Sequence, residues 1–168
     1  MKCAIFETEK EWLQPGAVRR IQDPGRAGGG ENGSGAMLQV KDTLRATVNL
    51  GFDGRVFKVY HGPDAEKRFA NEVKVLRHLE ARGCNFVPRL LEADPERLRI
   101  ITTNCGSRVE HLDAERARVL FAELETYGVR HDDPDVRNVT YRQSDGRFCV
   151  IDFEFATILP DFKAAPTK

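Results

Sequence analysis

The sequence predicts an α+β fold, in which an antiparallel five-stranded sheet carries one main helix and is followed by a smaller part. Three observations predict it. Short β-branched and aromatic runs recur between residues 37 and 60, an amphipathic helical pattern follows, and two further apolar runs come after it. Strands joined by tight turns pair antiparallel and bury one face under a helix, so this arrangement is expected here.

The first three strands are expected at residues 37–40, 46–50 and 56–60. Their β-branched and aromatic side chains suit a pleated, half-buried surface. Asp53-Gly54 lies between the second and third runs, and this dipeptide predicts a tight hairpin turn. The turn between the first two runs falls near residues 41–43, which contain no glycine.

The main helix is expected from Pro63 to about Arg82, where Gly83 provides a C-terminal stop. Its apolar positions recur with helical spacing and define one buried face: Ala65, Phe69, Val73, Leu76 and Leu79. Two more strands are expected at residues 86–92 and 98–103, which completes a sheet of five.

The second part begins after a break at residues 104–107. A helix is expected from Asp113, a residue type favoured at the N-cap, to Tyr127. A hairpin is then expected at residues 138–153. The predicted division is an N-terminal extension at 1–36 with a Gly-rich flexible segment at 25–35, a sheet unit at 37–104, a second unit at 105–160, and a disordered tail at 161–168.

The amino-acid composition disfavours several classes of protein. The 168 residues include 26 Lys and Arg and 26 Asp and Glu, so the net charge of about zero disfavours a nucleic-acid binder or a membrane-surface binder. The four cysteines show no paired spacing, so we expect reduced thiols and no zinc site. No apolar run near the N-terminus has the length of a signal peptide or membrane span, and a cytoplasmic location is expected.

The sharpest chemical signal lies in two segments near the C-terminus, His131 to Asn138 and Val150 to Glu154. Asp133, Asn138 and Asp152 together form a set of oxygen ligands that can orient a hydroxyl and hold Mg²⁺. The alternative is a turn with capping Asp and Asn residues and an unrelated hairpin Asp.

Lys58 lies within the apolar strand at residues 56–60. A cation on an apolar face needs an anionic partner, because burying it unpaired is costly. Glu72 lies on the inner side of the main helix and is the favoured partner, while Glu66 is the second candidate. The alternative is an ordinary solvent-exposed strand lysine.

In this order, Lys58, Glu72, Asp133, Asn138 and Asp152 resemble the protein-kinase-like superfamily. The chain is most similar in pattern to small atypical members, namely the RIO-type, lipopolysaccharide-type and aminoglycoside-type kinases. The resemblance implies a two-lobe fold, with residues 37–104 as the N-lobe and residues 105–160 as a reduced, truncated C-lobe. It also implies ATP and Mg²⁺ as cofactors.

The resemblance also implies roles. Lys58 would bind the nucleotide phosphates while paired with Glu72, and Asp133 would orient the acceptor hydroxyl and accept its proton late. Asn138 and Asp152 would be the metal ligands. The remaining nucleotide contacts are expected from Thr103, Asn104 and Arg137, of which Arg137 would add positive charge near the γ-phosphate.

Several positions depart from the protein-kinase pattern. Asp132 stands where protein kinases have Arg, Asp135 replaces a phosphate-binding Lys, and Glu154 replaces the Gly of Asp-Phe-Gly. His131 is expected to hold its loop by packing and hydrogen bonds. The Gly-rich segment 25–35 is either a plain linker or a loop that folds over the phosphates from outside the sheet.

Two main functions remain open at this point. The first is an ATP- and Mg²⁺-dependent phosphotransferase acting on a protein or small-molecule hydroxyl, and the second is a non-catalytic nucleotide-binding or partner-binding module. A third possibility is a chain that a partner completes, through a second copy or another protein. In that case apolar surface would be exposed around residues of the C-terminal segment: Phe153, Phe155, Ile158 and Leu159.

Overall fold

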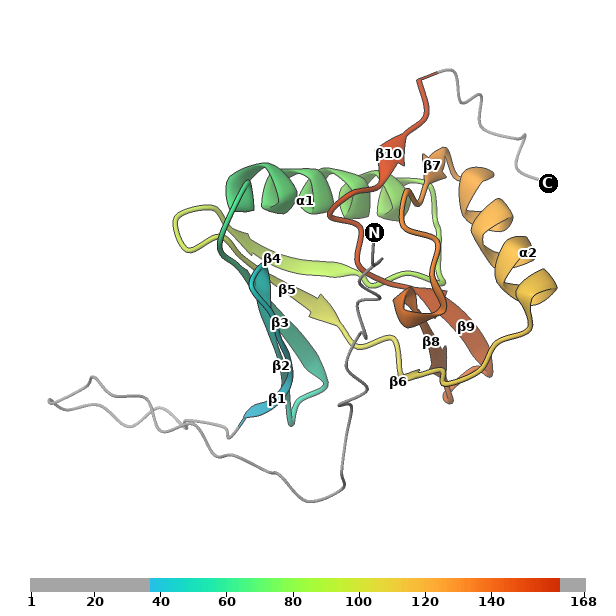
Figure 1. Cartoon of the computed structure of the whole chain (residues 1–168), viewed down its shortest axis with the longest axis horizontal. Helices are drawn as coiled ribbons and strands as arrows, with labels where there is room; N and C mark the ends of the chain where they lie inside the picture. The colour runs from blue at the N-terminus through green and yellow to red at the C-terminus, as the bar shows by residue number, and fades with distance from the viewer. Residues whose placement is uncertain (1–36, 161–168) are drawn as a thin grey trace, which may run out of the picture.

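The computed structural model describes residues 37–160, and the predicted extension at 1–36 and tail at 161–168 lie outside the described residues. The fold is α+β, as predicted, with a five-stranded antiparallel sheet and two α-helices in the described part. Figure 1 shows α1 along one face of this sheet, with α2 and the later strands beside it. In spatial order the sheet consists of β1 (Met37–Asp42), β2 (Ala46–Gly51), β3 (Arg55–Tyr60), β5 (Arg99–Thr103) and β4 (Leu90–Asp94).

The turn between β2 and β3 falls where the sequence predicts it, whereas the turn between β1 and β2 lies at residues 43–45 instead of 41–43, because Lys41 and Asp42 pair with β2. Gly54, in the turn between β2 and β3, has φ of 76°, a left-handed conformation that glycine adopts without steric cost. The turn between β1 and β2 uses no glycine. Instead, the Thr43 hydroxyl donates to the Ala46 carbonyl at 3.1 Å and accepts from the Arg45 and Ala46 amides.

Helix α1 (Ala65–Ala81) packs its apolar side against the sheet. Its predicted positions Phe69, Val73, Leu76 and Leu79 are all buried, and Leu79 is fully buried. The helix ends at Ala81 with Arg82 as its C-cap, and the φ of 71° at the next residue, Gly83, fits the left-handed C-terminal stop.

The second part is built around α2 (Ala114–Glu125) and a hairpin. Asp113 is the N-cap of α2, as predicted, and its side chain accepts hydrogen bonds from the Glu115 and Arg116 amides. The predicted hairpin is also present. The elements here are β6 (Ser107–Arg108), β7 (Val129–Arg130), the 3₁₀ helix η1 (Val136–Asn138), β8 (Val139–Arg142), β9 (Arg147–Val150) and β10 (Thr157–Ile158), with β6, β8 and β9 in one sheet and β7 paired with β10.

The prediction for the fourth strand was wrong in its position. A strand was expected at residues 86–92, but β4 spans Leu90–Asp94. Phe86 and Val87 are buried in the connection that precedes it, and Pro88, which lacks an N–H, cannot donate to a sheet ladder. Their apolar character therefore reflects core packing in a loop.

The exposed apolar surface also differs from the prediction. Phe153 was expected at an uncovered surface, yet its side chain is fully buried. It packs edge-on against His131, with ring centroids 5.4 Å apart. Phe155 is exposed, as expected, whereas Ile158 and Leu159 are half-buried. The uncovered surface is therefore smaller than the sequence implies.

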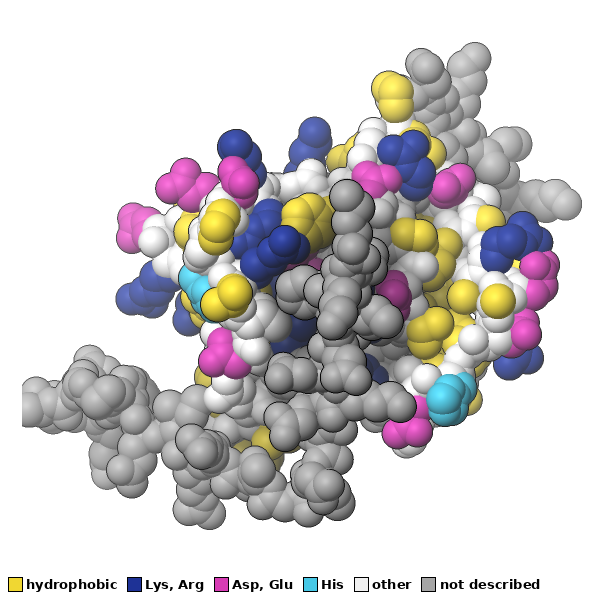
Figure 2. All heavy atoms as spheres, in the orientation of Figure 1, with side chains coloured by type: hydrophobic (Ala, Val, Ile, Leu, Met, Phe, Trp, Pro, Cys, Tyr) yellow, Lys and Arg dark blue, Asp and Glu magenta, His cyan; other side chains and the backbone are white. Residues whose placement is uncertain are grey.

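Three of the four cysteines, Cys84, Cys105 and Cys149, lie in the described part, where they are buried and free, as expected. Within residues 37–160, neither helix combines the length and the apolar character needed to cross a bilayer. Figure 2 shows acidic and basic side chains interspersed over the visible face.

Candidate active site

Lys58 projects from the middle strand of the sheet and is almost completely buried. Strand β3 lies between β2 and β5, which pairs Lys58 with Val48 on one side and Ile100 on the other. Its Nζ donates to Glu72 Oε2 and to Asp152 Oδ1, each at 2.7 Å. The alternative of a solvent-exposed lysine is therefore wrong.

Glu72 of α1 is the helix partner of Lys58, whereas Glu66 is exposed in the first turn of the helix. The Tyr60 hydroxyl, also from β3, donates to the same Oε2 of Glu72. Two donors on one oxygen fix the carboxylate in place. Burial raises the pKa of Glu72, although the attraction of Lys58 opposes this effect.

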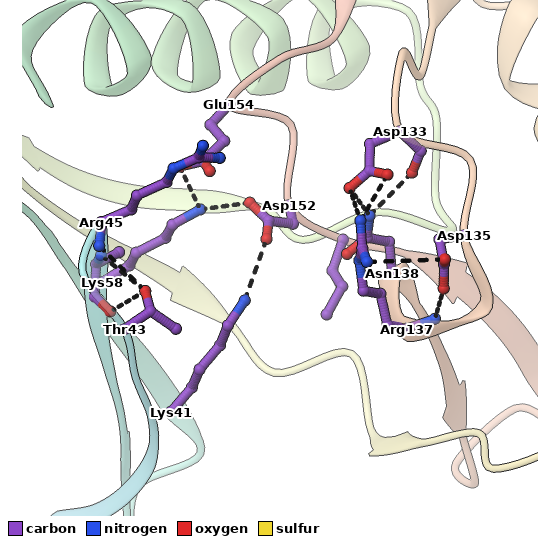
Figure 3. A network of polar contacts seen from close by, with 12 residues as sticks. Lys41, Thr43, Arg45, Lys58, Asp133, Asp135, Arg137, Asn138, Asp152 and Glu154 are labelled. Atoms are coloured by element: carbon purple, nitrogen blue, oxygen red, sulfur yellow. Dashed lines mark hydrogen bonds and ion pairs between the residues drawn. The ribbon is translucent and has the colours of Figure 1, made fainter. Parts of the chain in front are cut away.

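Asp152 brings the loop after β9 into the same cluster. Figure 3 shows Lys58 and Lys41 approaching its two carboxylate oxygens, and Lys41 Nζ lies 3.7 Å from Oδ2. The backbone of Asp152 has φ of 69°, a conformation that is uncommon for a residue other than glycine. This conformation is held by the contacts of the Asp152 carboxylate with Lys58 and Lys41.

Glu154 adds a third carboxylate, and its Oε2 lies 3.7 Å from Lys58 Nζ and 3.1 Å from Arg68 Nη1. Carboxylate oxygens of Glu72, Asp152 and Glu154 all lie within 4.8 Å of one another. These three acids face three cations: Lys41, Lys58 and Arg68. The positive and negative charges of the cluster therefore balance.

The charges in this cluster shift one another's pKa. Burial alone would lower the pKa of Lys58, but the three surrounding carboxylates outweigh it and raise that pKa above its usual value. Burial tends to raise the pKa of Asp152, and Lys58 and Lys41 overcome it, so the pKa lies below its usual value. Lys58 and Asp152 are thus both ionised at neutral pH.

Asp133, Arg137 and Asn138 form a second group of polar side chains, on the other side of Asp152 in Figure 3. The Asn138 amide nitrogen donates to the Asp133 carbonyl at 2.9 Å and to its Oδ2 at 3.2 Å. The Ile151 amide donates to the Asn138 carbonyl at 2.9 Å, which places Asn138 beside the segment that carries Asp152. The three predicted oxygen-bearing residues are therefore in neighbouring segments.

Arg137 pairs with Asp133, a contact that the sequence did not predict. Its Nη2 contacts both carboxylate oxygens of Asp133, at 2.7 and 2.6 Å, and its expected place near the γ-phosphate stays a prediction. This hydrogen bonding lowers the pKa of Asp133 below its usual value. Arg137 also lies 3.8 Å from Asp135, so it offsets the negative charge of that side chain as well.

Thr103 and Asn104 lie at the junction between the two parts, and their side chains make local bonds. The Thr103 hydroxyl accepts from the Arg89 amide at 3.0 Å, and Asn104 Oδ1 accepts from the Gly106 amide at 2.9 Å. Neither side chain has a contact with the Lys58 cluster within residues 37–160. Their assignment to the nucleotide therefore stays a prediction.

His131 holds its loop as expected. Its ring lies between Phe121 and Phe153, and its Nε2 is 3.1 Å from the Ile151 carbonyl. Asp132, which departs from the kinase pattern, accepts from the Arg130 guanidinium at 2.6 Å and from the Thr157 hydroxyl. Both residues thus tie the loop after β7 to neighbouring segments.

Five further residues of the cluster were not predicted as site residues from the sequence: Lys41, Tyr60, Arg68, Asn71 and Glu154. Asn71 donates to the carbonyls of Phe153, Glu154 and Ala156, which anchors the loop after Asp152 to α1. Spacing could have found two of them, because positions 68, 71 and 72 share one helix face. Lys41 carried no such signal, since its contact depends on pairing between β1 and β2.

A surface hollow of about 720 Å³ lies away from this cluster. Its lining comes from β6, α2 and the β8–β9 hairpin, and includes Arg108, Arg116, Tyr141 and Phe148. None of the lining residues belongs to the Lys58 or Asp133 groups. The buried charges, rather than the shape of this hollow, therefore locate the candidate site.

No protein-family model matches the sequence, and no curated protein matches it significantly. Among solved structures, the chain is similar to the Rio2 kinase of Chaetomium thermophilum in its complex with ADP, Mg²⁺ and phosphoaspartate, with a TM-score of 0.52 and 14% identity. The fold is protein-kinase-like. The match covers 70% of this chain and 47% of that kinase, so the chain spans about half of the kinase's length.

Proposed function

We propose that this chain is an ATP- and Mg²⁺-dependent phosphotransferase of the protein-kinase-like class, which transfers the γ-phosphate to a hydroxyl of a protein or small molecule. One observation carries the proposal. The amine of Lys58 lies 2.7 Å from both the helix carboxylate of Glu72 and the loop carboxylate of Asp152. In kinases an equivalent lysine–glutamate pair, with an aspartate beside it, prepares the site for nucleotide and metal.

The residues present fit Mg²⁺. This ion prefers hard oxygen ligands and is usually held by one or two protein groups together with substrate phosphates. Asp152 offers a carboxylate that is partly exposed, and Asn138 offers Oδ1, which makes no hydrogen bond within residues 37–160. A bound Mg²⁺ would neutralise charge on the triphosphate.

The protein's part in this chemistry is to hold groups in position and to supply positive charge. Lys58 stays anchored by Glu72 and can exchange its contact with Asp152 for a phosphate oxygen. Lys41, at the end of β1, supplies a second cation on the same side. Positioning and charge neutralisation of this kind account for most of the catalysis in phosphoryl transfer.

Asp133 would receive the proton of the acceptor hydroxyl. Its pKa is held low by Arg137, so its carboxylate is ionised over the whole neutral range. The proposed two-lobe arrangement would set the sheet and Lys58 on one side of the nucleotide, with Asp133 and Asn138 on the other. The ADP and Mg²⁺ in the Rio2 kinase complex support nucleotide and metal use by this fold.

One observation favours a non-catalytic nucleotide-binding module as the second candidate. Arg137 contacts both oxygens of Asp133 and the Asn138 side-chain amide contacts one of them, so protein donors already engage the carboxylate that would receive the acceptor proton. In that case the cluster around Lys58 would bind Mg·ATP without turnover.

The two candidates separate in a paired measurement. Mg·ATP binding by calorimetry and transfer of radiolabel from γ-labelled ATP are compared in wild type, Asp152→Asn and Asp133→Asn. Asp145→Asn serves as the control, since Asp145 pairs with Arg142 on the exposed β8–β9 turn. We expect Asp152→Asn to lose binding by at least about tenfold, as one hydrogen bond to a charged group predicts.

Asp133→Asn is expected to retain binding and lose transfer. If wild type binds Mg·ATP and transfers nothing to itself or to a cell extract, the non-catalytic module is correct. Treatment with hydroxylamine identifies the acceptor group, because a phosphohydroxyl product resists it and an acyl phosphate is cleaved. Absence of Mg·ATP binding to wild type contradicts both candidates.

A further inference from the structure

Arg68 is a buried residue that joins three separate segments beside the candidate site. It lies in the first turn of α1, and its side chain is only 5% exposed. Its guanidinium makes five hydrogen bonds, and a guanidinium has five N–H groups, so every donor is used. No N–H group of Arg68 remains to bind a substrate, so Arg68 can act only by holding other segments of the chain in position.

Its acceptors come from three places in the chain. Nη1 donates to the Arg45 carbonyl at 3.2 Å, in the turn between β1 and β2, and to Glu154 Oε2 at 3.1 Å. Nη2 donates to the His61 carbonyl at 2.7 Å, and Nε and Nη2 both donate to the Pro63 carbonyl. We call Arg68 with these acceptors the Arg68 junction.

The junction connects two segments that approach Asp152 from different sides. The β1–β2 turn begins two residues after Lys41, which pairs with Asp152, and Glu154 lies two residues after Asp152. The His61 amide donates to the Arg45 carbonyl at 2.9 Å, so the turn is held at the same point by a second bond. Arg45 also stacks over Phe155, with 5.5 Å from its Cζ to the ring centroid.

We propose that Arg68 is a positioning residue of the nucleotide site, which fixes the β1–β2 turn to the Asp152 loop so that the two segments open and close as one unit. Glu154, which replaces the glycine of the kinase pattern, is the acceptor that makes this link. The inference rests on the proposed function, because it places the β1–β2 turn and the Asp152 loop on opposite sides of a bound nucleotide phosphate.

An arginine is required here for a physical reason. A lysine at position 68 keeps the charge but offers three donors from one nitrogen, which cannot reach carbonyls and a carboxylate spread around a planar guanidinium. Arg68→Lys should therefore loosen the turn and the loop together. Glu154→Gln keeps the shape of the side chain and removes its charge, while one of its two acceptor oxygens becomes an NH₂ donor, so it tests the link with a smaller disturbance.

The test measures hydrogen exchange by mass spectrometry on the full chain without nucleotide. Exchange is compared in peptides covering residues 43–50, residues 151–157 and, as an internal reference, residues 73–81 of α1. We expect faster exchange in the first two peptides and unchanged exchange in the third for both Arg68→Lys and Glu154→Gln. Lys67→Ala is the matched control, because Lys67 is the adjacent helix cation and its side chain is 84% exposed.

A second readout distinguishes positioning from a merely structural role. The Kd for Mg·ATP of Arg68→Lys is expected to rise by about tenfold, the loss that corresponds to one hydrogen bond to a charged group. If wild type binds Mg·ATP and Arg68→Lys binds it equally well, the positioning role is wrong.

Exchange that accelerates in only one of the two peptides, in both variants, overturns the link itself. Equally faster exchange in all three peptides also overturns the link, because it indicates a general loss of stability. If wild type fails to bind Mg·ATP, the proposed function is wrong and the positioning role falls with it, while the nucleotide-free exchange data still decide whether Arg68 links the two segments.

Discussion

At the scale of single residues, Lys58 shows how a charged side chain can be stable inside a protein. Its amine has three carboxylates within 3.7 Å, and their attraction outweighs the loss of water around it. Such a group is stable only while its partners remain. The same feature makes the site responsive, because any ligand that draws Asp152 away frees a donor on Lys58.

Replacing Lys58 by Met should destabilise the fold by about 3 kcal/mol, since it leaves buried carboxylates without their counter-ion. The double variant Lys58→Met with Glu72→Met should recover part of that loss, because it removes one uncompensated charge. Urea unfolding of the single and double variants measures both effects. A loss for Lys58→Met no larger than that of the exposed Lys67→Ala would show that the buried pairing is not formed.

Arg137 sets the ionisation of Asp133. Because Arg137 holds the pKa of Asp133 below its usual value, Arg137→Ala should raise that pKa toward the ordinary aspartate range. The carboxyl carbon of Asp133 can be followed by ¹³C NMR during an acid titration. In an active enzyme, the acidic limb of kcat/KM should move to higher pH in the same variant. An unchanged Asp133 titration would contradict the contact between the two side chains.

Residue types indicated much of the site before the fold was known. The pairing of Lys58 with Glu72 follows from a rule that buried charges need partners, and the structure contains it. The contact of Lys41 with Asp152 and the bond between Arg137 and Asp133 could not be predicted from residue types. Both depend on rotamers and strand register, which neighbouring sequence does not determine.

At the scale of elements, the two helices begin in different ways. Asp113 caps α2 through its side chain, whereas Asp64 precedes α1 with φ of 55° and no side-chain cap. Asp113→Ala should therefore cost about 1 kcal/mol of stability. Asp64→Gly should cost nothing or stabilise slightly, because glycine adopts a left-handed φ without strain.

Thermal unfolding of these two cap variants gives the comparison. Equal losses in both would contradict the difference in capping. Periodicity and caps predicted both helices and most strands well. The fourth strand was misplaced because Phe86 and Val87 resemble a strand by composition, while their burial comes from contacts with the core in a loop.

At the scale of the whole molecule, the buried charge cluster connects distant parts of the chain. Lys58 and Asp152 are 94 positions apart, yet their contact is 2.7 Å. The order of motifs predicted this approach, and the protein-kinase-like fold provides it. The small size of the uncovered apolar surface was not predictable, because it depends on how Phe153 turns into the core.

The cluster also predicts how global stability depends on pH. The pKa of Asp152 is lower in the folded protein than in the unfolded chain. Its contribution is therefore present above the unfolded value of about 3.9 and is lost as pH falls through the folded value. Asp152→Asn should show a shallower loss of stability below pH 4 than wild type in urea unfolding. Parallel curves would show that Asp152 is not paired.

The central claim is that Lys58, Asp152 and Asn138 surround one metal–triphosphate position. Mn²⁺·ATP titration, followed by ¹H–¹⁵N NMR of the full chain, tests it most directly, because the paramagnetic ion broadens signals only near where it binds. We expect the amide signals of residues 58, 138 and 151–153 to disappear before those of the β8–β9 turn. Broadening centred elsewhere, or none at saturating nucleotide, would contradict it.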